Sequence, residues 1–182
     1  MQTGHMLSAL KDSLWNQFGA SIDMLRNAIM MCPEDYFNSN KKFFYKAYHC
    51  ILFLDYYLTI PPTHFSPLLP FSFTTAEDIP KDAVDDLVPD RIYSQNELLS
   101  YVQMAKIKCH DLIFSLTGEK LTQSWIKEPD QIVAGATMNF TVLDILLFNL
   151  RHVQHHIGQL NQLLRQGVDK SPDWVAIVEQ AK

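Results

Sequence analysis

Three of the seven histidines stand within five positions near the C-terminal end of the chain: His152, His155 and His156. They belong to the segment 141–166, which has no proline, one glycine and many leucines, so we expect one long helix there. On a helix, side chains four residues apart lie side by side, so His152 and His156 could bind one cation together. Neutral imidazole is a common zinc ligand and also suits nickel, copper and iron. Two buried histidines that bond to protein neighbours would give the same pattern, so a third ligand is needed.

A helical wheel of the segment 141–166 separates an apolar side from a wetter side. The apolar residues that we expect in the core are Val142, Leu146, Leu150, Val153, Ile157, Leu160 and Leu164. His152 and His156 lie at the border of this side. His155 and Arg151 lie on the wetter side, so His155 is not expected to join the pair.

A fourth histidine, His49, stands in the middle of the segment 42–59, which is apolar almost all round. This composition predicts a helix buried against several others. A buried imidazole needs a polar partner. A metal ion shared with His152 and His156 would provide one, and so would a tyrosine hydroxyl or a backbone carbonyl.

The stretch YHCILFLDYYL around His49 and the later stretch HVQHHIGQL together resemble the DinB-like superfamily, the damage-inducible B and YfiT-like metalloenzymes. The resemblance covers nearly the whole chain in element order. It implies a single domain over residues 1–182, an all-α four-helix bundle with a long crossover between its second and third helices. It also implies a zinc or nickel ion held by His49, His152 and His156. In this motif His155 matches an additional histidine that is not a ligand.

The resemblance also implies an activity class. Several DinB-like proteins are thiol S-transferases that use bacillithiol, mycothiol or glutathione, or isomerases that use such thiols. We therefore expect a small-molecule thiol and an electrophilic substrate at a divalent metal ion. Two alternatives stay open: a metal-dependent hydrolase and a non-enzymatic metal-binding stress protein, which could be a homodimer. Asp55 lies about 120° from His49 on the wheel, which counts against it as the base of a hydrolase. No catalytic or cofactor-binding residue is identified beyond the metal ligands.

Length and composition fit one soluble domain. The 182 residues are 47% hydrophobic and 19% charged, so the core needs no disulfide or structural metal. A net charge of −5 without a run of Lys or Arg argues against nucleic acid as a partner. Three widely spaced cysteines, Cys32, Cys50 and Cys109, indicate reduced thiols in a cytoplasm, and Cys50 is expected to be a small buried hydrophobe. We find neither a signal peptide nor an apolar run long enough to span a membrane.

Apolar residues at helical spacing predict a first helix over 6–31, ended by Pro33. A polar turn at 38–40, with Ser39 or Asn40 as helix cap, leads to the second helix, which we expect to be an antiparallel neighbour of the first. Residues 61–93 hold six of the nine prolines and predict a long crossover. It is expected to fold back over the helices, with its acids facing water and one histidine at the surface: Asp82, Asp85, Asp86 and His64.

The third helix is expected over 94–116, with a Ser94–Glu97 capping box and a stop at Gly118. Residues 119–139 look irregular, with Trp125 and Ile126 packed as a flap. The caps proposed for the histidine-rich helix are Asn139 and Thr141. Ser171-Pro172-Asp173 predicts a short terminal helix over 174–181.

Overall fold

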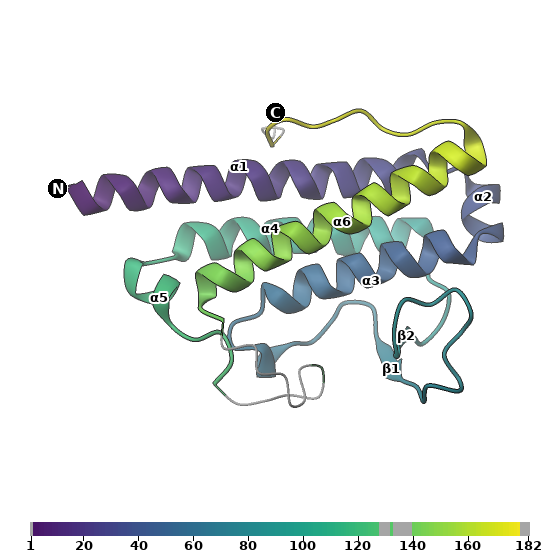
Figure 1. Cartoon of the computed structure of the whole chain (residues 1–182), viewed down its shortest axis with the longest axis horizontal. Helices are drawn as coiled ribbons and strands as arrows, with labels where there is room; N and C mark the ends of the chain where they lie inside the picture. The colour runs from purple at the N-terminus through teal and green to yellow at the C-terminus, as the bar shows by residue number, and fades with distance from the viewer. Residues whose placement is uncertain (1, 128–131, 133–139, 179–182) are drawn as a thin grey trace.

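The computed structural model describes residues 2–127, 132 and 140–178. Within them the chain is mostly helical, with one small antiparallel sheet, which confirms the all-α expectation (Figure 1). The helices are α1 (Gln2–Met31), α2 (Glu34–Ser39), α3 (Lys41–Tyr57), α4 (Gln95–Ser115), α5 (Gly118–Thr122) and α6 (Val142–Val168). The strands are β1 (Phe71–Phe73) and β2 (Leu87–Pro89). No helix in the described ranges is long and apolar enough to cross a membrane.

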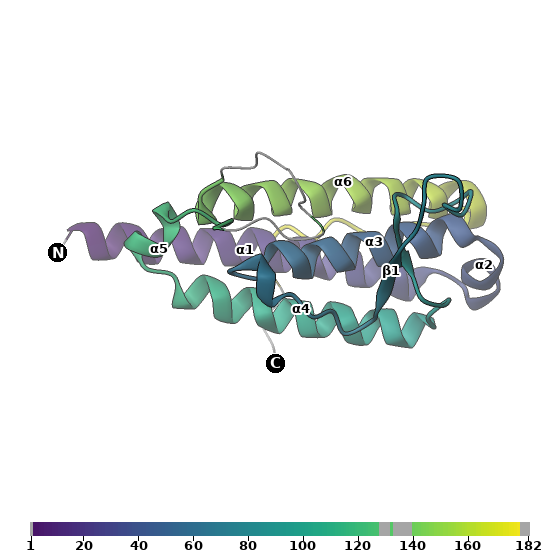
Figure 2. The same ribbon diagram turned by 90° about the horizontal axis from the view of Figure 1, so that it is seen from below.

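The four long helices, α1, α3, α4 and α6, lie along one another (Figures 1 and 2). Helix α1 packs against α4 and α6, and α3 packs against the same two helices. Helices α1 and α6 run in one direction, and α3 and α4 run in the other. The prediction that the first two long helices are neighbours is therefore wrong, although they are antiparallel. The crossover returns the chain to the end of the molecule at which α3 begins, and α4 starts there. Helices α4 and α6 then pack on either side of α1, and α3 lies across from it.

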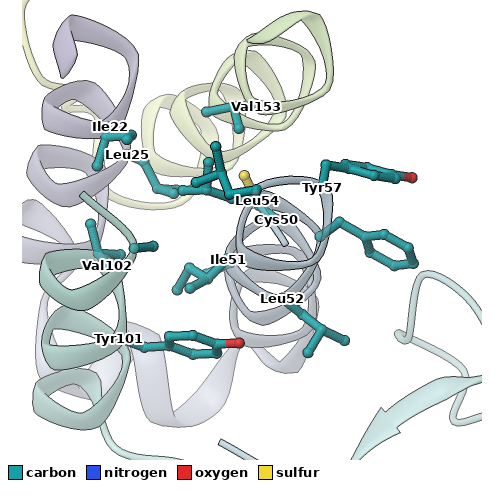
Figure 3. Packing of buried hydrophobic residues seen from close by; sticks show 14 of the residues in the cluster. Ile22, Leu25, Cys50, Ile51, Leu52, Leu54, Tyr57, Tyr101, Val102 and Val153 are labelled. Atoms are coloured by element: carbon teal, nitrogen blue, oxygen red, sulfur yellow. The ribbon is translucent and has the colours of Figure 1, made fainter. Parts of the chain in front are cut away.

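The core forms where the apolar sides of the four long helices meet. Figure 3 shows Ile22 and Leu25 of α1 near Leu54 of α3, Val102 of α4 and Val153 of α6, and all five are buried. Of the seven core residues that the wheel predicted on α6, six are buried and Leu150 is partly exposed. Burial of such side chains contributes roughly 1.5–3 kcal/mol each, and this contribution holds the helices together.

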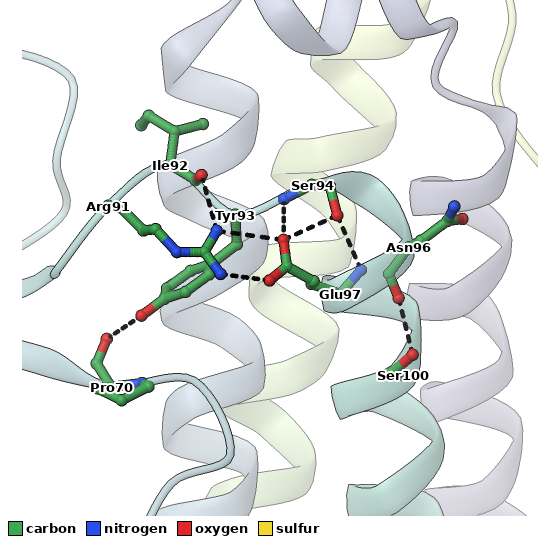
Figure 4. Close-up of polar contacts among 8 residues, drawn as sticks. All are labelled: Pro70, Arg91, Ile92, Tyr93, Ser94, Asn96, Glu97 and Ser100. Atoms are coloured by element: carbon green, nitrogen blue, oxygen red, sulfur yellow. Dashed lines mark hydrogen bonds and ion pairs between the residues drawn. The ribbon is translucent and has the colours of Figure 1, made fainter.

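Local caps fix where the functional helices begin. The Thr141 side chain accepts a hydrogen bond from the Asp144 amide at 3.2 Å, and the Asp144 carboxylate accepts one from the Thr141 amide at 3.1 Å, which forms a capping box. The alternative cap, Asn139, lies outside the described residues. The cap of α3 is Asn40, whose side chain accepts from the Phe43 amide at 3.1 Å. The predicted Ser94–Glu97 box at α4 is confirmed (Figure 4).

The crossover between α3 and α4 contains a β-hairpin, which the sequence pattern did not predict. Strands β1 and β2 pair with Phe71 opposite Pro89 and Phe73 opposite Leu87. The hairpin lies beside α3 (Figures 1 and 2). His64 is exposed, as expected. The expectation that all three crossover acids face water holds for the exposed Asp86. Asp82 and Asp85 are partly buried, and Asp85 lies against His49.

Two expectations about the segments between the long helices are also corrected. Residues 34–39 form the helix α2 rather than ending in a polar turn, because Phe37 is buried in the core. Gly118 does not stop a helix. It begins α5, because the Thr117 side chain caps this helix and Leu121 is buried beneath it.

The predicted terminal helix is absent over 174–178, and residues 179–182 lie outside the described part. Helix α6 ends at Val168, before Asp169 in the left-handed region with φ 54°. The following segment runs back along α1, where Val178 packs directly on Gly19, a position with no room for a Cβ atom. This tertiary contact overrides the local helix signal of Pro172.

A buried polar network joins α3 to α4. The Asp55 carboxylate is 2.5 Å from the Lys108 ammonium and accepts a hydrogen bond from the Tyr101 hydroxyl at 2.8 Å. Lys108 also donates to the Thr59 hydroxyl at 2.6 Å. The Trp125 indole donates to the Thr59 carbonyl at 3.0 Å and the side chain is fully buried, which confirms that Trp125 is packed. Asp55 is thus fully occupied by structural partners.

We predict that Lys108→Met lowers the free energy of unfolding by about 2–3 kcal/mol, because it leaves the buried Asp55 carboxylate without its cation. Urea denaturation followed by circular dichroism measures this loss. The matched control is Arg91→Met, which breaks the exposed ion pair with Glu97 and should change stability little. Equal effects of the two variants would contradict a structural role for the buried pair.

Candidate metal centre

The packing of α3 against α6 brings the three predicted ligands together. The Nε2 atom of His49 lies 3.2 Å from Nε2 of His152, which in turn lies 3.1 Å from Nε2 of His156. One ligand atom from each ring lies within 4.8 Å of the other two. The exposed ring of His155 is 3.0 Å from the Gln159 amide nitrogen and does not belong to this group. The wheel thus separated His155 correctly from the pair that flanks it.

The spacing of these nitrogen atoms fits a shared metal ion. Zinc–nitrogen bonds of 2.0–2.1 Å in a tetrahedral site place two nitrogens about 3.3–3.4 Å apart, close to the separations seen here. Hydrogen bonds among the rings satisfy the group poorly, because Nε2 of His152 faces two other ring nitrogens and carries at most one proton. A divalent cation would accept all three lone pairs. The group could therefore hold a metal ion.

Two of the three rings have a second polar partner. Nδ1 of His49 is 3.0 Å from the Asp85 carboxylate, a contact with the distance of an ion pair but without the alignment of a good hydrogen bond. Nδ1 of His156 is 3.0 Å from the Gln159 side-chain oxygen. Nδ1 of His152 is buried and has no hydrogen-bond partner among the described residues. Neither a tyrosine hydroxyl nor a backbone carbonyl bonds to His49 within the described ranges, so this alternative for its partner is not supported.

Asp85 and Gln159 are site residues that the sequence analysis missed. A signal was present for Gln159, because it lies three residues after His156 and so shares its helix face. Asp85 gave no such signal, because it belongs to a segment without helical period that only the tertiary structure brings to α3.

Aromatic rings cover one side of the histidines. The ring centre of Phe53 lies 4.6 Å from that of His49, and the ring centre of Tyr57 lies 5.8 Å from that of His152. Burial, reinforced by the neighbouring histidines, lowers the pKa of His152 to about 3. Burial likewise lowers the pKa of His156 to about 4. The neighbouring His49 lowers this pKa further, whereas the hydrogen bond to Gln159 raises it. Both rings are thus neutral near pH 7, the form that binds a metal.

No protein-family model, curated protein or solved structure matches the chain. The likeness to the DinB-like superfamily therefore rests on the histidine motifs and the order of the helices.

We predict about one divalent ion per chain, lost on replacing His49, His152 or His156 by alanine. Each replacement removes a ligand, so the affinity should fall by more than the about 10–100-fold typical of changes outside the ligand shell. Elemental analysis after dialysis against trace zinc measures the content. His155→Ala is the matched control and should keep the ion. Loss of metal in the control but not in His156→Ala would reverse our assignment.

The lowered pKa values predict how pH affects the metal-free protein. Above about pH 6.5 both rings are neutral in the folded and the unfolded chain, so pH has no effect through them. As pH falls from 6.5 towards 4, the unfolded chain binds protons at His152 and His156 that the folded chain excludes, so the free energy of unfolding falls. We expect a loss of about 2 kcal/mol between pH 7 and pH 5, allowing for partial solvent exposure.

Urea denaturation at both pH values in the presence of a chelator measures this loss. The double variant His152→Gln/His156→Gln has no imidazoles at these positions and should show a much smaller difference between pH 7 and pH 5. An unchanged difference would mean that other groups cause the pH dependence.

Proposed function

We propose that the chain is a DinB-like metalloenzyme that binds one zinc or nickel ion through His49, His152 and His156 and transfers a small-molecule thiol to an electrophile. The observation that carries this proposal is the convergence of three Nε2 atoms from α3 and α6. Three histidine ligands leave a coordination position for a substrate, which is the composition of a catalytic rather than a closed structural site.

The arrangement of the long helices supports the family assignment. We interpret α1, α3, α4 and α6 as a four-helix bundle in which the crossover after α3 allows α4 to run parallel to it. One histidine on the second long helix then faces a pair on the fourth, as the DinB-like resemblance implies.

The thiol has to come from outside the chain. All three cysteines are buried, and burial raises the pKa of Cys32 to about 12 and the pKa values of Cys50 and Cys109 also well above the ordinary range. Such thiols do not ionise near neutral pH, so they are poor nucleophiles. None of them belongs to the histidine group. A low-molecular-weight thiol is therefore the substrate that this site requires for S-transfer.

The surrounding residues suit such a substrate. A bound divalent ion would lower the pKa of a thiol placed at the open position. Phe53 and Tyr57 shield one side of the histidines from water. Lys46 lies near enough to His156 for its charge to lower the pKa of that ring, so it also attracts the carboxylates that glutathione and bacillithiol carry.

The hydrolase alternative is weaker, because it needs a general base that the site does not provide at Asp55. That carboxylate is bound by Lys108 and Tyr101 on the side of α3 that packs against α4. S-transfer needs no such base once the thiol is ionised.

We predict metal-dependent conjugation of glutathione or bacillithiol with 1-chloro-2,4-dinitrobenzene. Absorbance follows the product, and His49→Ala should reduce the rate at least about 100-fold because the ion is lost, whereas His155→Ala should stay close to the unmodified protein. Ester or amide cleavage at full rate without added thiol would favour the hydrolase. Inactivity of the metal-loaded protein in both assays would favour a non-enzymatic metal-binding role.

A further inference from the structure

We propose that Asp85 is a positioning residue for His49 and that, through it, the crossover hairpin is coupled to occupancy of the metal site. This inference rests on the metal site of the proposed function but not on the reaction. It assigns a role in the site to a segment outside the four long helices.

The Asp85 carboxylate is held from two sides. One oxygen accepts a hydrogen bond at 3.2 Å from the amide of Leu87, the first residue of β2. The other oxygen lies 3.0 Å from Nδ1 of His49. The side chains of His49 and Asp85 are only 12% and 28% exposed, so water screens their interaction incompletely. The start of β2 thus determines where the carboxylate meets the ring.

Although the contact is not aligned as a good hydrogen bond, a negative charge 3.0 Å from Nδ1 disfavours a lone pair on that atom and so favours one tautomer of His49. A neutral imidazole carries one proton, and a carboxylate only accepts, so Asp85 favours the form with the proton on Nδ1. The lone pair is then on Nε2, the atom that faces His152 at 3.2 Å. The Gln159 oxygen makes the equivalent contact with Nδ1 of His156. Two of the three ligands are therefore oriented before a metal binds, one by α6 itself and one by the crossover.

The hairpin is fixed to α3 at a second point next to His49. The Tyr48 hydroxyl donates to the carbonyls of Leu69 and Pro70, at 2.8 Å and 3.0 Å, just before β1. The Tyr93 hydroxyl donates to the same Pro70 carbonyl at 2.8 Å (Figure 4). Two consecutive residues of α3 thus contact the hairpin: Tyr48 just before β1 and His49, through Asp85, just before β2. Metal binding to His49 should strengthen the Asp85 contact and so protect the hairpin, because outer partners of metal-bound histidines stabilise the bound state.

The first test measures zinc affinity by competition with a chromophoric chelator. Asp85→Ala should weaken binding about 10–100-fold, the usual effect of losing an outer carboxylate. Asp86→Ala is the matched control, since Asp86 is an exposed neighbour outside the histidine group, and it should bind like the unmodified protein. Equal affinities of Asp85→Ala and the control would overturn the proposal.

The second test needs no metal. Nitrogen-15 NMR of the metal-free protein at pH 8 should find the His49 proton on Nδ1, and Asp85→Ala should give a mixture of tautomers. If the unmodified protein binds no zinc, the proposed function fails, whereas the tautomer of His49 still decides the role of Asp85. An unchanged tautomer in Asp85→Ala would overturn that role.

Hydrogen exchange tests the coupling to the hairpin. Zinc should slow exchange of the Thr74 amide, which donates across the hairpin to the Asp86 carbonyl, in the unmodified protein but not in Asp85→Ala. Equal protection in both would overturn the coupling. If the alanine variant does not fold, Asp85→Asn replaces it, because its single amide oxygen can still accept from Nδ1 of His49, although the Leu87 amide then loses its acceptor. This variant should keep the tautomer and bind zinc with intermediate affinity, and full affinity would count against the proposal.

Discussion

The close packing of α3 against α6 is the constraint on which the rest of this structure depends. Both helices carry histidines at the edge of their apolar sides, so burying those sides against each other also brings the imidazoles together. Hydrogen bonds among the rings satisfy this group poorly, because Nε2 of His152 faces two other ring nitrogens and carries at most one proton. Hydrophobic burial thus assembles a polar group that needs a cation to complete it.

The Asp55 network and the histidine group differ in how well their polar atoms are satisfied. Asp55 has a cation, a hydroxyl donor and no open direction, as a structural ion pair requires. In the histidine group Nε2 of His152 faces two other ring nitrogens, and the buried Nδ1 atoms of His49 and His152 make no hydrogen bond in the described ranges. Buried polar atoms without a hydrogen bond are uncommon in folded proteins, and a cluster of such rings is the arrangement in which a bound ion would supply the missing partner.

The crossover adds a residue from outside the four long helices to the histidine group. Its length allows α4 to run parallel to α3, and its hairpin places Asp85 against His49. The same segment therefore determines the order of the helices and supplies a partner for one proposed ligand. The crossover has a defined structure although it is rich in proline. Proline restricts the backbone, and the hydroxyls of Tyr48 and Tyr93 hold the chain at the Pro70 carbonyl.

The pattern of residues along the chain was enough to predict the long helices, to propose His49, His152 and His156 as candidate ligands and to separate His155 from them. Helical period and capping residues are local features, so they leave a readable pattern in the sequence. Only the tertiary structure decided that α1 and α3 do not pack as neighbours, that Val178 rather than a terminal helix covers Gly19, and that Asp85 faces a histidine instead of water. These features depend on contacts between residues far apart in the chain. Such contacts leave no period in a single sequence, so burial and chain topology settle them after the local signals have been used.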